Sequence, residues 1–144
     1  MSVNSILENK GNDDVTTVEP TTDIATAVSL LAARNIGALI VVDSNQQVAG
    51  IISERDVIRE LANHGVEMLR RSVGDVMTRK VVTCSRVDTI GAVMELMTAG
   101  RFRHLPVIER GQLVGIISIG DVIKHRLYEI ETESATLRDY IRNA

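Results

Sequence analysis

The feature that most constrains this chain is an internal repeat, because each copy of a repeated segment has to form the same structural unit. Residues 50–59, Gly-Ile-Ile-Ser-Glu-Arg-Asp-Val-Ile-Arg, recur as residues 115–124, Gly-Ile-Ile-Ser-Ile-Gly-Asp-Val-Ile-Lys. Two upstream segments also recur: residues 39–43 match 105–109, and residues 15–17 match 81–83. With a gap of one residue near Gln46, about 15 of roughly 44 aligned columns are identical, well above chance.

Each copy begins with the same alternation of extended and helical patterns. A short extended piece, residues 15–18 or 81–84, precedes a helix whose apolar residues recur at helical spacing. Those apolar residues are Ile24, Ala27, Val28 and Leu31 in the first copy and Ile90, Val93, Met94 and Met97 in the second. Thr22 or Asp23 can cap the first of these helices, and Asp88 can cap the second.

Two buried strands and a second helix complete each copy. The strands cover residues 38–42 and 48–52, or 105–108 and 113–117, and a short polar turn joins each pair as a hairpin. The second helix begins near Glu54 or Gly120, with Ser53 or Ser118 as its N-cap. One such unit of about 60 residues is too small to bury both faces of its sheet. We therefore predict an α/β fold of the α+β type, with tandem β-α-β-β-α repeats packed sheet to sheet around a pseudo-twofold axis.

The repeat also predicts the division of the chain. We expect a first repeat over residues 1–66, a second repeat over 67–128, and a C-terminal helical extension over 129–144. Residues 72–77 are predicted to form a short helix that leads into the second copy, and residues 2–7 a matching helix for the first. Residues 9–14 are predicted to be a polar loop. The extension has Leu127, Ile130, Leu137 and Ile141 on about one helical face, so it either meets a partner subunit or closes the core.

Composition limits the kinds of core and partner. Aromatic residues make up 2% of the 144 residues and Trp is absent, so the core has to be aliphatic. The net charge of −3 argues against non-specific nucleic-acid binding, which needs a basic surface. Cys84 is the single cysteine, which excludes an internal disulfide and a cysteine-based zinc site. The histidines lack metal-ligand spacing, so we expect no metal.

The N-terminus predicts the compartment. It lacks a basic segment followed by an apolar one, which a secretory signal peptide would have. No uninterrupted apolar run approaches the roughly 20 residues needed to span a membrane. We therefore expect a cytoplasmic protein.

The repeated Gly-Ile-Ile-Ser-x-x-Asp segment lies where a strand passes into a helix, and its residue types are those that a polar ligand site needs. Glycine allows close backbone approach, and serine with the first-turn amides can hold an anion such as phosphate. An aspartate three residues later can accept hydrogen bonds from a ribose diol. Helix capping alone explains the same residues. Because the segment occurs twice in register, we favour the ligand site.

These residues resemble the cystathionine β-synthase (CBS) domain pair, a regulatory unit also called a Bateman module. The resemblance covers about residues 3–128. It depends on residues 75–78 (Asp-Val-Met-Thr), residues 103–107 (Arg-His-Leu-Pro-Val), the two strand-end threonines and both Gly-Ile-Ile-Ser-x-x-Asp segments. It implies that two clefts between the repeats bind AMP, ADP, ATP, NAD(H) or S-adenosylmethionine. It also implies that two such pairs assemble into a flat disc, so we expect a homodimer of CBS pairs.

The resemblance assigns roles to individual residues. Asp56 and Asp121 would hold ribose diols, with the serines and threonines beside the ribose or phosphate. The backbone around residues 38–39 and 104–105 would read the adenine edge. Separately, because cationic groups near a cleft favour phosphate, we expect Arg55, Arg103 and His104 to serve phosphate groups. The predicted nucleotide-binding residues are Thr17, Gly37, Ala38, Leu39, Ser53, Arg55, Asp56, Thr83, Arg103, His104, Leu105, Pro106, Ser118 and Asp121.

Taken together, the residues and the resemblance predict a regulatory sensor of an adenine nucleotide, with no catalytic residues and no catalytic cofactor. Occupancy would be transmitted by a change of conformation or of oligomeric state, with or without a separate effector protein. Two alternatives stay open. One is a protein-interaction scaffold with vestigial clefts, and the other is a nucleic-acid-binding accessory protein, which the acidic charge and scarce aromatics oppose.

Overall fold

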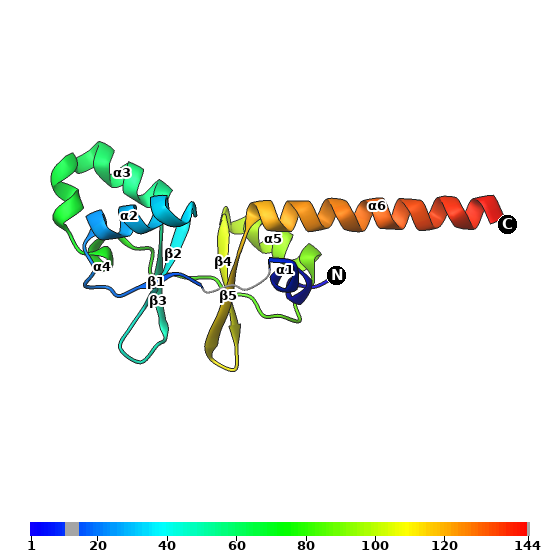
Figure 1. Ribbon diagram of the computed structural model, residues 1–144, viewed down its shortest axis with the longest axis horizontal. Helices are drawn as coiled ribbons and strands as arrows, with labels where there is room; N and C mark the ends of the chain where they lie inside the picture. The colour runs from blue at the N-terminus through cyan, green and yellow to red at the C-terminus, as the bar shows by residue number, and fades with distance from the viewer. Residues whose placement is uncertain (11–14, 144) are drawn as a thin grey trace. The chain divides into compact units, whose positions relative to one another are not determined.

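A computed structural model describes residues 1–10 and 15–143 of the chain (Figure 1). One short N-terminal helix, α1 (Val3–Lys10), precedes the first copy. The first copy then forms β1 (Thr17–Val18), α2 (Ile24–Arg34), β2 (Ala38–Val42), β3 (Val48–Ser53) and α3 (Glu54–His64). The rest of the chain forms a 3-10 turn (Val66–Arg70), α4 (Val73–Val76), α5 (Ile90–Gly100), β4 (His104–Glu109), β5 (Gln112–Ser118) and α6 (Ile119–Asn143). Of the predicted loop over residues 9–14, Asn9 and Lys10 belong to α1, and residues 11–14 lie outside the described residues.

The strands follow the predicted order in both copies. β1 pairs in parallel with β2, and β2 pairs antiparallel with β3, with Ile40 opposite Ile51. In the second copy β4 and β5 form the hairpin, and Cys84 alone bridges in parallel to Val107. The predicted extended piece over residues 81–84 is therefore a single-residue bridge. The mixed helices and sheets confirm the predicted α+β class.

The helix that follows the first strand begins at the same aligned residue in both copies. Asp23 caps α2, accepting a hydrogen bond of 2.8 Å from the Thr26 amide. In the second copy Thr89, not Asp88, caps α5 through a 3.1 Å bond from the Ala92 amide. Asp88 instead accepts from the Ser85 amide at 2.9 Å. The prediction of Asp88 as the cap was wrong, because the N-cap is the residue directly before the first buried isoleucine.

The chain divides into two compact units that exchange their lead-in helices. The first-copy unit holds β1, β2, β3, α2, α3 and α4. The second-copy unit holds α1, α5 and α6 with most of β4 and β5. Each lead-in helix therefore packs with the copy that it does not precede in the chain. The sequence boundaries at residues 66 and 128 stay a prediction about the repeats.

Backbone contacts fix this exchange within each unit. In the second-copy unit the amides of Val3 and Asn4 donate to the carbonyls of Asp88 and Arg86 at 2.9 and 3.0 Å. In the first-copy unit the Val73 amide donates to the Thr22 carbonyl at 2.7 Å. In each case the lead-in segment lies against the chain that enters α2 or α5.

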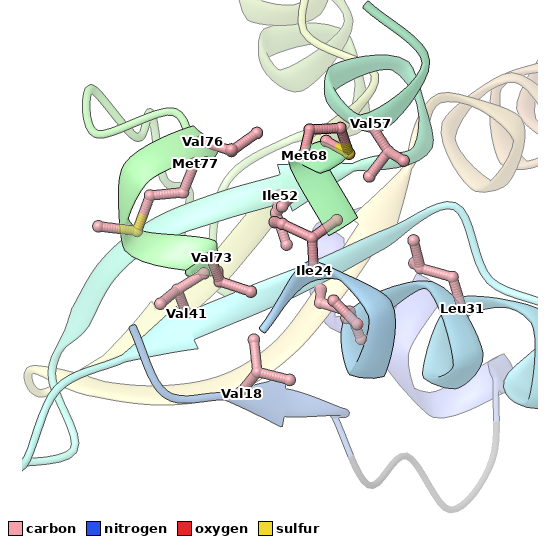
Figure 2. Close-up of a cluster of buried hydrophobic side chains, with 12 residues drawn as sticks. Val18, Ile24, Leu31, Val41, Ile52, Val57, Met68, Val73, Val76 and Met77 are labelled. Atoms are coloured by element: carbon pink, nitrogen blue, oxygen red, sulfur yellow. The ribbon is translucent and has the colours of Figure 1, made fainter. Parts of the chain in front are cut away.

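The core of the first-copy unit is aliphatic, as the composition predicts. Figure 2 shows side chains from the sheet (Val18, Val41, Ile52), from α2 (Ile24, Leu31) and from α4 (Val73, Val76) packed into one cluster. Burying branched aliphatic side chains supplies about 1.5 to 3 kcal/mol each. The exchanged helix α4 thus contributes to the core of the first copy.

The C-terminal helix α6 is continuous from Ile119 to Asn143, so the predicted extension is part of the last helix of the second copy. Val122 and His125 are its buried residues. Among the described residues, no helix is both long enough and apolar enough to cross a membrane.

Candidate functional site: paired Ser-x-x-Asp caps

The first copy holds Asp56 in a reciprocal cap at the start of α3. The Ser53 amide donates to Asp56 Oδ2 at 2.9 Å, and the Asp56 amide donates to Ser53 Oγ at 3.3 Å. Arg59, one turn later, donates to Asp56 Oδ1 at 2.9 Å. Asp56 is 6% exposed. A buried carboxylate is stable only when it is paired and hydrogen-bonded, and this cap meets both conditions within one helical turn.

The second copy repeats the cap with a different cation. The Ser118 amide donates to Asp121 Oδ2 at 2.9 Å, and the Asp121 amide donates to Ser118 Oγ at 3.1 Å. Lys10 Nζ, at the end of α1, lies 3.0 Å from Asp121 Oδ2 and also donates to the Ile116 carbonyl at 3.0 Å. The Asp121 side chain is more accessible than that of Asp56.

Lys10 stabilises the ionised form of Asp121. Partial burial raises the pKa of Asp121, but the bonds from the Ser118 amide and from Lys10, together with the charge of Lys10, outweigh it, so the pKa lies below its ordinary value of 3.8. Sequence reasoning missed Lys10 because it lies far from the motif in the chain. The only signal was a basic residue at the end of the lead-in segment.

The backbone at the entry to β2 and to β4 meets these caps. The Glu54 amide donates to the Gly37 carbonyl at 3.0 Å, and the Ile119 amide donates to the Arg103 carbonyl at 2.8 Å. Ala38 is also the register partner of Ser53. The structure thus brings the predicted adenine-reading segment and the predicted ribose-binding motif together within each copy.

Other predicted residues contribute in more limited ways. The side chains of Leu39 and Leu105 are fully buried, and Pro106 is buried with its carbonyl accepting from the Cys84 amide at 3.0 Å. Their side chains belong to the core, whereas Gly37 and His104, at the entries to β2 and β4, are half-buried. Thr17 and Thr83 are exposed, each directly before a buried residue at a matching place.

A cationic residue lies near each cap, Arg55 next to Asp56 in the sequence and Arg103 through the bond of its carbonyl with the Ile119 amide. Arg55, in the first turn of α3, and Arg103, directly before β4, are exposed. In the part of the chain that the structure describes, neither forms an ion pair. His104 is half-buried and has an interacting partner. The two arginines are therefore available to a phosphate group.

The remaining titratable candidates do not form a second site. Within residues 1–10 and 15–143, no cluster of three or more His, Cys, Asp or Glu side chains could hold a metal ion. Cys84 is buried, and burial, with a smaller contribution from the charge of Asp88, raises its pKa to about 12. The thiol is therefore protonated at neutral pH and is not an activated nucleophile.

Comparisons with known proteins agree with this geometry. The CBS domain family matches residues 9–63 and 73–128. The chain is 35% identical over 148 residues to the mitochondrial CBS domain-containing protein CBSX3 of Arabidopsis thaliana, covering 98% of this chain and 72% of that protein. It is 39% identical over 103 residues to an uncharacterized 33.4 kDa protein of Thermofilum pendens, covering 72% of this chain and 33% of that protein.

Solved structures give the same result. The CBS-domain protein ATU1752 of Agrobacterium tumefaciens is 47% identical with a TM-score of 0.83, covering 87% of this chain and 92% of that one. CBSX2 in complex with AMP is 26% identical with a TM-score of 0.70, covering 88% and 96%. The CBS domain pair of protein MJ0100, in complex with 5′-methylthioadenosine and S-adenosyl-L-methionine, is 25% identical with a TM-score of 0.77, covering 91% and 98%. With its two repeats, its α+β fold and these matches, the chain belongs to the CBS domain family.

Proposed function

We propose that this chain is a regulatory module that binds an adenosyl nucleotide, AMP, ADP, ATP or NAD(H), at its Ser-x-x-Asp caps. Occupancy is passed on through a change of conformation or association, and the chain itself catalyses no reaction. The observation that carries the proposal is the paired carboxylate, Asp56 and Asp121, held by the same reciprocal cap in both copies.

A fixed carboxylate suits a ribose diol. An ionised carboxylate offers about four acceptor positions on its two oxygens. Among the described residues, the hydrogen bonds that Asp121 accepts all reach Oδ2, which leaves Oδ1 to accept from a ribose hydroxyl. Lys10 favours the ionised form of Asp121, which accepts hydrogen bonds and donates none, as a pair of hydroxyl donors requires.

The backbone and charge around the caps suit the rest of a nucleotide. The strand entries at Gly37 and Arg103 lie against the first residues of α3 and α6, so base-reading backbone and diol-binding carboxylate are neighbours. Helix N-termini favour anions, and the exposed Arg55 and Arg103 add positive charge. A ligand with adenine, ribose and phosphate matches these three features.

Two similar structures support this ligand class. CBSX2 holds AMP, and the MJ0100 pair holds 5′-methylthioadenosine and S-adenosyl-L-methionine. These three ligands share an adenosyl group and differ in what is attached to it. The shared group supports an adenosyl ligand for this chain, and the cationic residues favour a phosphorylated one.

The test is calorimetry and thermal unfolding of the whole chain with AMP, ADP, ATP, NAD⁺, NADH and S-adenosylmethionine. A ligand at 100 times its dissociation constant stabilises the fold by about 2.7 kcal/mol. We expect Asp56→Asn/Asp121→Asn to remove this stabilisation, since asparagine keeps the shape but loses the charge. Asp75→Asn, an exposed first-turn aspartate of α4, is the matched control and should bind normally.

Two results would contradict the proposal. If none of the six compounds stabilises the wild type, the caps are structural and the scaffold alternative takes over. If the double variant binds as tightly as the wild type, the nucleotide binds elsewhere on the chain.

A further inference from the structure

The last helix of the second copy is much longer than its counterpart in the first. α6 has 25 residues and α3 has 11, although both begin at the same repeated motif. The residues of α6 from Ile130 onward are all exposed. In Figure 1 this part of α6 extends past α1 and α5 of its own unit. The part of α6 from Ile130 to Asn143 is therefore a helix that does not pack against the core of its unit.

An apolar seam runs along this exposed stretch. Ile123, Leu127, Ile130, Ser134, Leu137 and Ile141 follow one another at alternating steps of four and three residues. The five apolar members are between 44% and 65% exposed. Alternating steps of three and four place residues on one narrow face that suits a second helix, as in a coiled coil. At 3.6 residues per turn, this face points away from the buried Val122 and His125.

The exposed stretch is poorly equipped to be stable by itself. Isolated helices shorter than about 12 to 15 residues are marginal in water. Between Ile130 and Asn143 no acidic residue stands four positions before a basic one, and only Asp139 and Arg142 form such a pair at a spacing of three, so the stretch has few of the favourable pairs that stabilise single helices. β-branched Thr132 and Thr136 weaken it further. A partner that covers the seam would supply the missing stability.

The charges beside the seam identify that partner. Arg126 and Glu133 stand directly before the seam residues Leu127 and Ser134, and Glu131 and Arg138 stand directly after Ile130 and Leu137. When two copies of the helix run parallel and in register, each residue before the seam faces the residue five positions later on the other copy. Arg126 then meets the partner subunit's Glu131, and Glu133 meets the partner subunit's Arg138. Both contacts join opposite charges.

We propose that α6 binds α6 of a second copy of this chain as a parallel, in-register coiled coil along the seam. Arg126 also bonds Glu129 of its own helix at 3.1 Å, so Glu133 and Arg138 are the cleaner pair to test. Ser134 lies at the middle of the seam, where a polar residue restricts which registers are stable. The pairing needs no nucleotide, so it stands independently of the function proposed above.

The first experiment measures molar mass by sedimentation over concentrations from micromolar to millimolar. Leu137→Asp places a charge in the seam, and Thr136→Asp places the same charge on the adjacent, outward-facing residue. We expect Leu137→Asp to lower the mass at a given concentration and Thr136→Asp to leave it unchanged. A wild type that is monomeric throughout the series, or a mass that Leu137→Asp does not reduce, overturns the proposal.

The second experiment tests the orientation. Arg138→Glu sets like charges against each other and should weaken association roughly tenfold, and Glu133→Arg added to it should restore the wild-type affinity. Ile141→Cys should form a disulfide-linked dimer with oxidised glutathione, since parallel pairing brings the two residues within bonding reach. Antiparallel pairing would separate them by up to roughly 27 Å. An absent crosslink, or no rescue by the double variant, contradicts the parallel arrangement.

Discussion

The two copies use the same cap but neutralise its carboxylate differently. In the first copy Arg59 lies one turn along the same helix as Asp56. In the second, Lys10 reaches Asp121 from α1, at the opposite end of the sequence. The first carboxylate therefore keeps its cation whenever α3 is formed, and the second keeps its cation only when α1 is packed. The repeated sequence conserves the cap in both copies, but the surrounding segments decide whether the paired cation comes from the same helix or from a distant one.

The motif glycines show the same contrast. A Cβ on Gly50 would lie 2.8 Å from the Thr78 carbonyl oxygen and 2.6 Å from Met77 Sδ. A Cβ on Gly115 would lie 2.7 Å from the Cδ2 methyl of Leu7. The close approach that these glycines permit is thus made by the exchanged lead-in segments. In the first copy the neighbour includes backbone, and in the second it is the end of a side chain.

The largest expected difference follows from these glycines. Gly50→Ala should reduce the free energy of unfolding by about 1 to 3 kcal/mol, because the backbone at Thr78 has to move. Gly115→Ala should cost less than about 1 kcal/mol, since Leu7 can change its rotamer. Urea unfolding of both variants measures the difference.

Gly91→Ala is the control for these substitutions. Nothing lies within 4 Å of its added Cβ, so alanine in α5 should stabilise the helix by about 0.5 to 1 kcal/mol. Equal losses at Gly50 and Gly115 would contradict the distinction between backbone and side-chain neighbours.

A smaller effect is expected at Lys10. Lys10→Met removes a partly exposed ion pair, which contributes about 0 to 1 kcal/mol at neutral pH. Because the folded-state pKa of Asp121 is lowered from its ordinary value of 3.8, its contribution is fully present above that value, which holds in the unfolded chain. It is lost as the pH falls through the lower folded-state pKa. The stability difference between wild type and Lys10→Met should therefore be largest above about pH 4 and shrink below it.

Urea unfolding at several pH values checks this expectation. Lys80→Met, which removes an exposed lysine of the first-copy unit, should give a difference that does not depend on pH in the same range. A Lys10→Met variant whose deficit grows on acidification would have the wrong sign and would exclude the ion pair as its cause.

The smallest change in stability is expected at a position where the two copies hold different side chains in the same surroundings. Val18 pairs with Val41 as Cys84 pairs with Val107, so Cys84→Val imports the residue that the first copy uses. We expect the free energy of unfolding to change by less than about 1 kcal/mol, measured by thermal unfolding. A larger loss would show that the thiol, whose Sγ lies 3.8 Å from the Pro106 carbonyl, contributes more than its volume.

Patterns within one copy were predictable because they depend on neighbouring residues. Alternation and apolar runs placed β2 correctly at both ends and β3, β4 and β5 to within one residue at each end. The spacing of Ser53 and Asp56, or Ser118 and Asp121, indicated the caps. The cap of α5 was misassigned because Thr22-Asp23 and Asp88-Thr89 carry the same residue types in opposite order. Both types can cap, and only the register of the helix decides between them.

Contacts between distant segments were not predictable from those patterns. The copy with which a lead-in helix packs depends on tertiary contacts such as that of the Val73 amide with the Thr22 carbonyl. The pairing of Lys10 with Asp121 follows from the same exchange. Periodicity shows which face of a helix is apolar, but it carries no information about which apolar surface will cover that face.

The exchanged helices set an order of events during synthesis. The first-copy unit needs Val73 and Val76 for its core, so it cannot close until the ribosome has passed into the sequence before the second copy. The second-copy unit needs Val3, Ile6 and Leu7, which emerge first and have to wait for nearly the whole chain. A shortened chain that ends after α3 therefore has α1 without the second copy that α1 packs against. It also has the sheet of the first copy without α4, which contributes to the core on that sheet. Only a fragment that holds the rest of the chain, with α4 and the second copy, supplies both missing parts.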